Sequence, residues 1–254
     1  MQNKFIYENG RKMLKLDEIA ENYHLNSNIP DMYIENICQK FEFNWIKSFI
    51  SESHHILDLG YGDGLFLDFL PKHNNLTILE GSKKLFEKAN EEVRKLASNA
   101  KIVLSLFEEF ETEQKFDLVI ASHVLEHVEN PTILLQKVRK WLSPNGKLIV
   151  VVPNSESFHR KLGVILKLQN KLDDLSPRDL AVGHLRVFNC DSLKHLLDLN
   201  GFQVTHERGF FLKVLSNAQM LNLDSKVIHG LCELSTDLPV QFGANIGMVA
   251  VKND

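Results

Sequence analysis

Asp58-Leu59-Gly60-Tyr61-Gly62-Asp63-Gly64 is the stretch of sequence that decides the fold. The run from His54 to Leu59 is typical of a strand, and Leu65 to Leu70 is typical of the helix that follows it. A glycine-rich turn between a strand and a helix brings backbone N–H groups close to a ligand, because no Cβ intervenes. The stretch is therefore a candidate ligand loop at the carboxyl end of a first strand.

The spacing of the glycines narrows the choice of ligand. A dinucleotide fingerprint needs a glycine where Leu65 stands, and a phosphate-binding loop needs a G-K-[ST] that is absent here. A nicotinamide oxidoreductase is therefore disfavoured. Glu80 ends the next predicted strand, 22 residues after Asp58, where a carboxylate can accept both hydroxyls of a ribose. Asp58 is expected to hold a ligand ammonium through water or to fix the amides of the loop.

Alternating strand and helix patterns extend outward from this loop and predict crossover units on a parallel sheet. Ser82 and Asp191 are predicted helix caps, Pro131 suits a first helical turn, and Pro144-Asn145-Gly146 predicts a turn before a strand. The later strands are expected at 76–80, 101–104, 116–121, 147–152, 202–207 and 246–251. Residues 1–50 are expected to form a helical cover, 51–254 the catalytic domain, and about 154–190 a lid insertion within it.

Bulk composition excludes several classes of protein. The 254 residues are 44% apolar and carry a net charge of −4. A chain with this charge has no overall positive potential that would attract nucleic acid. The three cysteines Cys38, Cys190 and Cys232 form no C-x-x-C pair, and the polar N-terminus has no signal-like apolar core. We expect a cytoplasmic protein without a membrane span, and the oligomeric state stays open.

Five segments together resemble the class I S-adenosylmethionine-dependent methyltransferases, in the branch with LEH after the fourth strand. They are ILDLGYGDG, LEGS, FDLVIASHVLEHVENP, LSPNGKLIVVVPN and GHLRVF. The resemblance implies an α/β, Rossmann-like sheet of seven strands with an antiparallel last strand and helices on both faces. It implies S-adenosylmethionine as cofactor, with S-adenosylhomocysteine as product, bound by Asp58, Gly60, Tyr61, Gly62, Gly64, Glu80, Gly81, Phe107, Ser122 and His123.

The segment Ser122-His123-Val124-Leu125-Glu126-His127 follows the fourth strand, where the methyl donor and acceptor of the family meet. One helical turn would bring His123, Glu126 and His127 to the same face. Three titratable groups at the end of a strand favour chemistry over a purely structural role. His127 or His123 is the predicted general base that deprotonates a hydroxyl, with Glu126 beside it.

A metal site is the alternative reading of the same segment. Ubiquinone-pathway O-methyltransferases and small-RNA 2′-O-methyltransferases resemble it, but they have a glutamate at the position of His123 and bind a divalent ion. The alternative ligands in this chain are His123, Glu126, His127 and the distant His184, a set that suits a transition metal better than magnesium. The leading expectation is that no metal is bound.

The segment Gly183 to Phe188 is similar to a stretch that lines the acceptor pocket in relatives. His184 and Arg186 are therefore expected to bind the acceptor, together with Tyr33 of the helical cover. The guanidinium of Arg186 matches an acidic or phosphorylated acceptor, because it offers a fork of donors to an oxyanion.

The predicted function is methylation of a small-molecule hydroxyl, for example on a phosphorylated or saccharide precursor of a surface polysaccharide. Three alternatives stay open: methylation of RNA or another macromolecule, metal-dependent O-methylation of the quinone-precursor type, and cofactor binding without catalysis. A DNA amino-group enzyme is disfavoured, because Ala121-Ser122-His123-Val124 stands where those enzymes have an N/D-P-P-Y-type tetrad.

Overall fold

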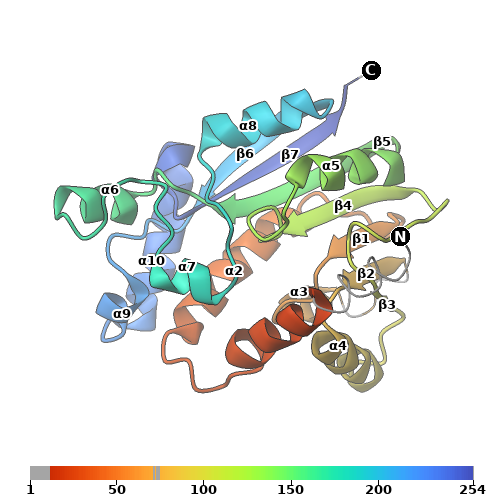
Figure 1. Cartoon of the computed structure of the whole chain (residues 1–254), viewed down its shortest axis with the longest axis horizontal. Coiled ribbons are helices and arrows are strands. Elements are labelled where there is room, and N and C mark those ends of the chain that lie inside the picture. The colour runs from red at the N-terminus through yellow and green to blue at the C-terminus, as the bar shows by residue number, and fades with distance from the viewer. Residues whose placement is uncertain (1–11, 71, 73–74, 254) are drawn as a thin grey trace.

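A sheet of seven strands forms the centre of the computed structural model, which describes residues 12–70, 72 and 75–253 (Figure 1). The strand order is β3-β2-β1-β4-β5-β7-β6, with β7 antiparallel to both of its neighbours. This confirms the predicted Rossmann-like sheet. The strands are β1 (Ile56–Leu59), β2 (Leu76–Glu80), β3 (Lys101–Leu104), β4 (Phe116–Ser122), β5 (Leu142–Pro153), β6 (Phe202–Phe210) and β7 (Asn245–Lys252).

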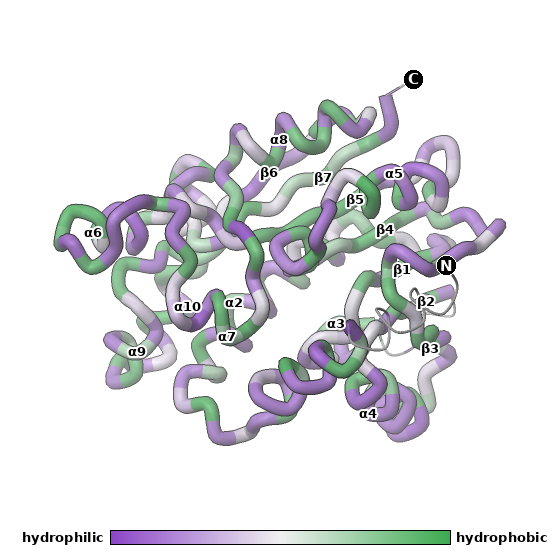
Figure 2. Tube along the Cα trace, viewed as in Figure 1, coloured by the Kyte–Doolittle hydropathy of each residue, from purple (hydrophilic) through white to green (hydrophobic). Residues whose placement is uncertain are grey.

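Helices cover both faces of the sheet (Figure 1). On one face α5 (Pro131–Trp141) and α8 (Cys190–Leu199) bury Leu134, Trp141 and Leu193 against the strands. On the other face α2 (Met32–Lys47), α3 (Leu65–Phe69) and α4 (Lys83–Lys95) contribute Ile46, Phe66 and Leu85. Hydrophobic residues are concentrated along the central strands between these two layers (Figure 2). Burial on both faces explains why the parallel strands are continuously apolar in sequence.

A third apolar cluster joins the N-terminal part of the chain to its C-terminal part. Ile34 and Cys38 of α2 pack with Phe211, Met220 and other residues that follow β6. The helical elements here are α9 (Asn217–Met220), α10 (Ser225–Leu234), and two short 3₁₀ turns, η2 (Ser235–Asp237) and η3 (Val240–Phe242). This cluster holds α2 beside the end of the sheet at which β6 finishes.

The structure tests the helix caps that the sequence predicts at Ser82 and Asp191. The Ser82 side chain accepts a hydrogen bond from the backbone N–H of Leu85, which confirms the predicted cap of α4. The predicted cap at Asp191 is wrong, because Asn189 caps α8 in a reciprocal capping box with Ser192. An amide oxygen two residues earlier satisfies the free N–H groups and moves the start of the helix upstream.

The predicted turn at 144–146 lies within β5, which begins at Leu142 rather than at Lys147. Phe116 pairs with Leu142 and Leu118 pairs with Lys147, so the register between β4 and β5 shifts at this point. β5 continues through the extra residues as an irregularity instead of ending there, because the residues before and after them both pair with β4.

The segment between β5 and α8, which the sequence predicts to be a lid insertion, contains α6 (Phe158–Ile165) and α7 (Pro177–Ala181). Residues 12–19 are helical and lead into the π-helical turn η1 (Ala20–His24). The first 11 residues of the expected N-terminal cover lie outside the described part of the chain. Among the residues described, no helix has both the length and the apolar character needed to cross a membrane.

Candidate functional site

A cavity of about 850 Å³ lies at the carboxyl ends of the parallel strands. In an open α/β sheet the ligand crevice is expected outside these ends. The structure brings ten of the predicted site residues together in the wall of this cavity: Asp58, Gly60, Tyr61, Gly62, Glu80, Phe107, Ser122, His123, His127 and His184. The cavity therefore joins the glycine loop to the histidines that follow β4.

The glycine loop leaves room for a ligand to approach its backbone. Gly60 and Gly62 have φ angles of +92° and +54°, in a region of backbone conformation that residues with a side chain rarely adopt. A Cβ added at either residue would meet no atom within 4 Å. The backbone of both glycines is therefore accessible from open space, as it must be in a loop whose N–H groups bind a polar ligand.

Gly64 and Gly81, which the sequence also predicts to bind the cofactor, do not line the cavity. The Tyr61 ring occupies the position where a Cβ of Gly64 would stand, and the Leu16 side chain packs against Gly81. Both residues allow close packing around the loop.

Two buried carboxyl groups lie beneath the loop. The Glu80 carboxylate accepts hydrogen bonds from the backbone N–H groups of Tyr61 at 2.8 Å and Ser82 at 2.6 Å. Burial raises the pKa of Glu80, although these two N–H groups oppose the increase. Burial and the neighbouring Glu80 raise the pKa of Asp58. Each Glu80 oxygen keeps a further lone pair, which can accept a hydroxyl of a ribose.

The N-terminal segment forms one wall of the cavity through Leu16, Ile19, Tyr23 and His24. His24 Nδ1 lies 2.7 Å from a carboxylate oxygen of Asp63, at the end of the glycine loop. Another contact of this segment is the Asp17 carboxylate, which accepts from the Ser82 hydroxyl at 2.6 Å. The segment is thus attached to the two loops that carry the glycines and Glu80.

His123 is held between two buried carboxylates. Its Nε2 lies 3.0 Å from Glu42 and its Nδ1 lies 3.3 Å from Glu126. Burial alone would lower the pKa of His123, but these two carboxylates raise it well above its usual range. The imidazole is therefore protonated at neutral pH, and neither ring nitrogen has a lone pair free for a substrate proton or a metal.

His127 has the opposite environment, although it belongs to the same turn. Burial lowers the pKa of His127 to about 4, an effect that Glu126 opposes. Its ring packs edge-on against His184 with centroids 4.7 Å apart. His127 is therefore neutral and lines the cavity. Of the two predicted bases, it alone has a nitrogen lone pair available at neutral pH.

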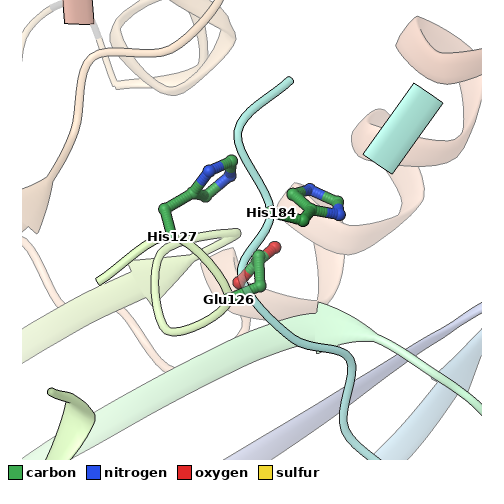
Figure 3. Close-up of side chains that lie close together, drawn as sticks. All are labelled: Glu126, His127 and His184. Carbon is green, nitrogen blue, oxygen red and sulfur yellow. The ribbon is translucent and has the colours of Figure 1, made fainter. Parts of the chain in front are cut away.

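Glu126, His127 and His184 form a cluster whose candidate ligand atoms lie within 4.8 Å of one another (Figure 3). The two residues from the segment after β4 meet His184 from the segment after α7 (Figure 3). Within the described residues, neither oxygen of the fully buried Glu126 carboxylate receives a hydrogen bond, and its contact to His123 is an ion pair. A second carboxylate, Asp179, accepts a hydrogen bond from His184 Nδ1 at 3.0 Å, and Nε2 has no hydrogen-bond partner in the described part of the chain.

Arg186 and Tyr33 do not line the cavity. The Arg186 guanidinium donates to the backbone carbonyl oxygens of Leu125, Val128 and Glu129. These bonds attach the Gly183–Phe188 segment to the turn that contains His127. The Tyr33 hydroxyl donates to the carbonyl of Leu221 at 3.2 Å. The geometry favours structural roles for both residues.

Three further residues of the site were not predicted from the sequence: Glu42, Asp179 and Lys213. Glu42 lies on the buried face of α2, in line with Ile34, Cys38 and Ile46 at helical spacing. A carboxylate within such an apolar stripe is a signal that could have identified it, because a buried charge needs a partner. Asp179 and Lys213 gave no comparable signal in the sequence.

Comparison with known families gives a match over residues 31–207 to the family described as methyltransferase domain. An (S)-coclaurine N-methyltransferase from Thalictrum flavum subsp. glaucum is 30% identical over 105 residues, which cover 40% of this chain and 29% of that protein. A ubiquinone biosynthesis O-methyltransferase from Rickettsia typhi is 26% identical over 166 residues, which cover 62% of this chain and 66% of that protein. The chain thus spans less than two thirds of the length of these relatives.

Solved structures with the same fold cover nearly the whole chain. A methyltransferase from Thermotoga maritima, described as a possible histamine N-methyltransferase, has a TM-score of 0.63 at 19% identity. That match covers 94% of this chain and all of the other. A coclaurine N-methyltransferase bound to N-methylheliamine and S-adenosylhomocysteine has a TM-score of 0.59 at 17% identity, covering 85% of this chain and 72% of that one. At these identities the similarity establishes the shared fold.

Proposed function

The chain belongs to the methyltransferase domain family, and from that premise we propose that it transfers a methyl group from S-adenosylmethionine to a small-molecule acceptor. S-adenosylmethionine is the cofactor of this family. The observation that supports the proposal most directly is the cavity, in which the bare glycine loop and Glu80 share one space with His127 and His184.

The residues of the cavity fit the cofactor. In our proposal Gly60 and Gly62 offer backbone to its amino-acid part, Glu80 accepts its ribose hydroxyls, and Phe107 contacts its adenine. Asp58 is buried beneath the loop, where it can fix the loop or hold the ammonium through water. The bound cofactor supplies an electrophilic methyl group on a sulfonium sulfur. The chain must then hold an acceptor atom in line with that methyl group, and positioning of this kind contributes roughly 7–11 kcal/mol in favourable cases.

We propose a hydroxyl as the acceptor group and His127 as the base that takes its proton. A neutral imidazole in the wall of the cavity supports this role, since it can accept the proton as the oxygen–carbon bond forms. The protonated His123 is proposed to position His127, because the His123–Glu126 ion pair holds the turn on which His127 lies. The acceptor class stays as predicted, with a phosphorylated or saccharide precursor of a surface polysaccharide as its example.

The proposal predicts cofactor binding and product formation with purified protein. S-adenosylhomocysteine is expected to bind with a Kd at least 100-fold lower than that of NAD, since the loop lacks the dinucleotide spacing. Calorimetry measures both constants. A panel of hydroxylated sugars, sugar phosphates and hydroxybenzoates, with amines and short RNAs for comparison, is then assayed for S-adenosylhomocysteine release. Tight binding without product from any acceptor would favour a binding protein, and faster turnover on RNA would favour the macromolecular alternative.

A metal-assisted reaction is a second candidate, favoured by the buried Glu126 carboxylate, whose oxygens receive no hydrogen bond within the described residues, beside His127 and His184. Two imidazoles and one carboxylate suit zinc or another transition metal. Asp179 would then orient His184, as outer-shell carboxylates commonly orient metal-bound histidines. The two candidate roles exclude each other at His127, because a lone pair given to a metal cannot accept a proton.

The metal candidate predicts that Zn²⁺ or Mn²⁺ raises the Tm of chelator-treated protein. Saturation at 100 times the Kd stabilises by about 2.7 kcal/mol, which corresponds to about 5–10 °C for a chain of this size. The shift is expected to disappear in Glu126→Gln and to persist in His195→Ala, which changes an exposed histidine of α8. Elemental analysis of the purified protein gives the stoichiometry. Absence of both metal and shift, with turnover unaffected by EDTA, would leave the metal-free base as the mechanism.

A further inference from the structure

Lys213 lies in the wall of the same cavity, on the segment that follows β6. Hydrogen bonds fix the backbone immediately before it. The backbone N–H of Phe211 donates to the Ser235 hydroxyl oxygen at 3.0 Å, and the Phe211 carbonyl accepts from the N–H groups of Ala244 and Lys213. The Phe211 ring is buried in the cluster that joins α2 to α10. The position from which the Lys213 side chain extends is therefore set by packed structure.

The acidic groups near Lys213 are already paired with other residues. Glu35 accepts from the Asn217 amide at 2.9 Å, pairs with Arg178 at 2.9 Å, and accepts from the Tyr23 hydroxyl. Asp31, another acid of this wall, pairs with the same Arg178. In these contacts the two carboxylates pair with residues other than Lys213.

The other cations of this wall are also paired. Arg160 pairs with Asp179 at 2.7 Å and donates to two backbone carbonyls. Arg178 pairs with Asp31 and Glu35. The Nζ of Lys213, by contrast, has neither an ion pair nor a hydrogen bond to any residue of 12–70, 72 or 75–253. Lys213 thus brings a positive charge to the cavity without a compensating partner in that part of the chain.

The charged groups around Lys213 and the pKa of its ammonium favour binding of an anion. Burial lowers the pKa of the Lys213 ammonium, Arg178 and Arg160 add to that effect, and Glu35 and Cys38 oppose it. Burial also raises the pKa of the Cys38 thiol. The Lys213 side chain is half-buried in the wall of the cavity, and withdrawing an ammonium from water is costly unless it is paired. An anionic ligand would remove this cost.

We propose that Lys213 binds an anionic group of the acceptor, a carboxylate or a phosphate, and thereby selects acidic acceptors for methylation. The inference rests on the proposed function for its second half, because it assumes that the cavity holds the acceptor beside the cofactor. It transfers to Lys213 the recognition of an acid that the sequence suggested for Arg186, whose guanidinium is occupied by backbone carbonyls.

The first test measures binding and needs no turnover. Protein saturated with S-adenosylhomocysteine is titrated calorimetrically with benzoate, phenyl phosphate and the neutral benzamide. We expect at least one anion to bind 10-fold or more tightly than benzamide, and the stronger of the two identifies carboxylate or phosphate as the preferred group. Lys213→Met is expected to abolish the difference, Lys213→Arg to retain it, and Lys226→Met, at an exposed lysine of α10, to leave it unchanged. Equal affinities, absence of binding included, or a preference that survives in Lys213→Met, would overturn the proposal.

The second test measures turnover with matched acceptors, a dihydroxybenzoate and the corresponding dihydroxybenzamide. The expected kcat/KM for the acid exceeds that for the amide 10-fold or more, and Lys213→Met removes this ratio while the Kd of S-adenosylhomocysteine stays within 3-fold. Equal kcat/KM values in the unmodified protein would contradict selection of acids. Failure of every acceptor to give product would count against the proposed function, whereas the anion preference of the loaded protein would still decide the role of Lys213.

Discussion

His127→Ala is expected to lower kcat by about 10²–10⁴-fold, the range that a positioned general base contributes. The variant removes the neutral imidazole that lines the cavity, whereas the glycine loop and Glu80 are untouched. The Kd of S-adenosylhomocysteine is therefore expected to change by less than about 3-fold, since less than 1 kcal/mol of cofactor binding depends on this side chain. Turnover with an acceptor found in the panel and calorimetry with S-adenosylhomocysteine measure the two quantities.

Two comparisons make the His127 result specific. His195→Ala removes an exposed histidine of α8 and is expected to retain full activity. Metal analysis of His127→Ala separates the two candidate roles, because loss of a bound metal together with turnover would assign His127 as a ligand. Turnover equal to that of the unmodified protein would exclude both roles.

Glu80→Gln is expected to weaken binding of S-adenosylhomocysteine by about 10–100-fold. Hydrogen bonds to a charged group contribute about 1.5–3 kcal/mol, and each 1.4 kcal/mol changes affinity about tenfold. The amide also brings N–H donors to a place where the backbone N–H groups of Tyr61 and Ser82 already donate. The substitution therefore weakens the loop as well as the proposed ribose contact.

Calorimetry and thermal unfolding distinguish these contributions of Glu80. Glu91→Gln removes an exposed carboxylate of α4 that pairs with Lys95, and it is expected to change neither the Kd nor the Tm measurably. If Glu80→Gln lowers the Tm but binds the cofactor with unchanged Kd, the carboxylate serves the loop alone and the proposed ribose role is lost.

Elements that depend on neighbouring residues were predicted well. The bounds of β2 and β3 agree with the predicted strands, and the Ser82 cap is confirmed. Strand patterns, caps and glycine turns involve residues within about one helical turn of each other, so their signals remain in the sequence. The two corrected details, the Asn189 cap and the longer β5, arise where two local signals compete or where pairing with β4 overrides a turn.

The candidate ligand loop and the class of chemistry were therefore predicted from the sequence itself, because the order Asp58, glycine loop, Glu80 and LEH turn places each group at the end of a strand. Tertiary structure alone decided what each side chain can do. Glu42 meets His123 across 81 positions of sequence and keeps it protonated, while the same turn leaves His127 neutral. Lys213 enters the cavity because packing around Phe211 directs it there. Charge state and pairing depend on burial and on partners far away in the chain, and neither is encoded in local spacing.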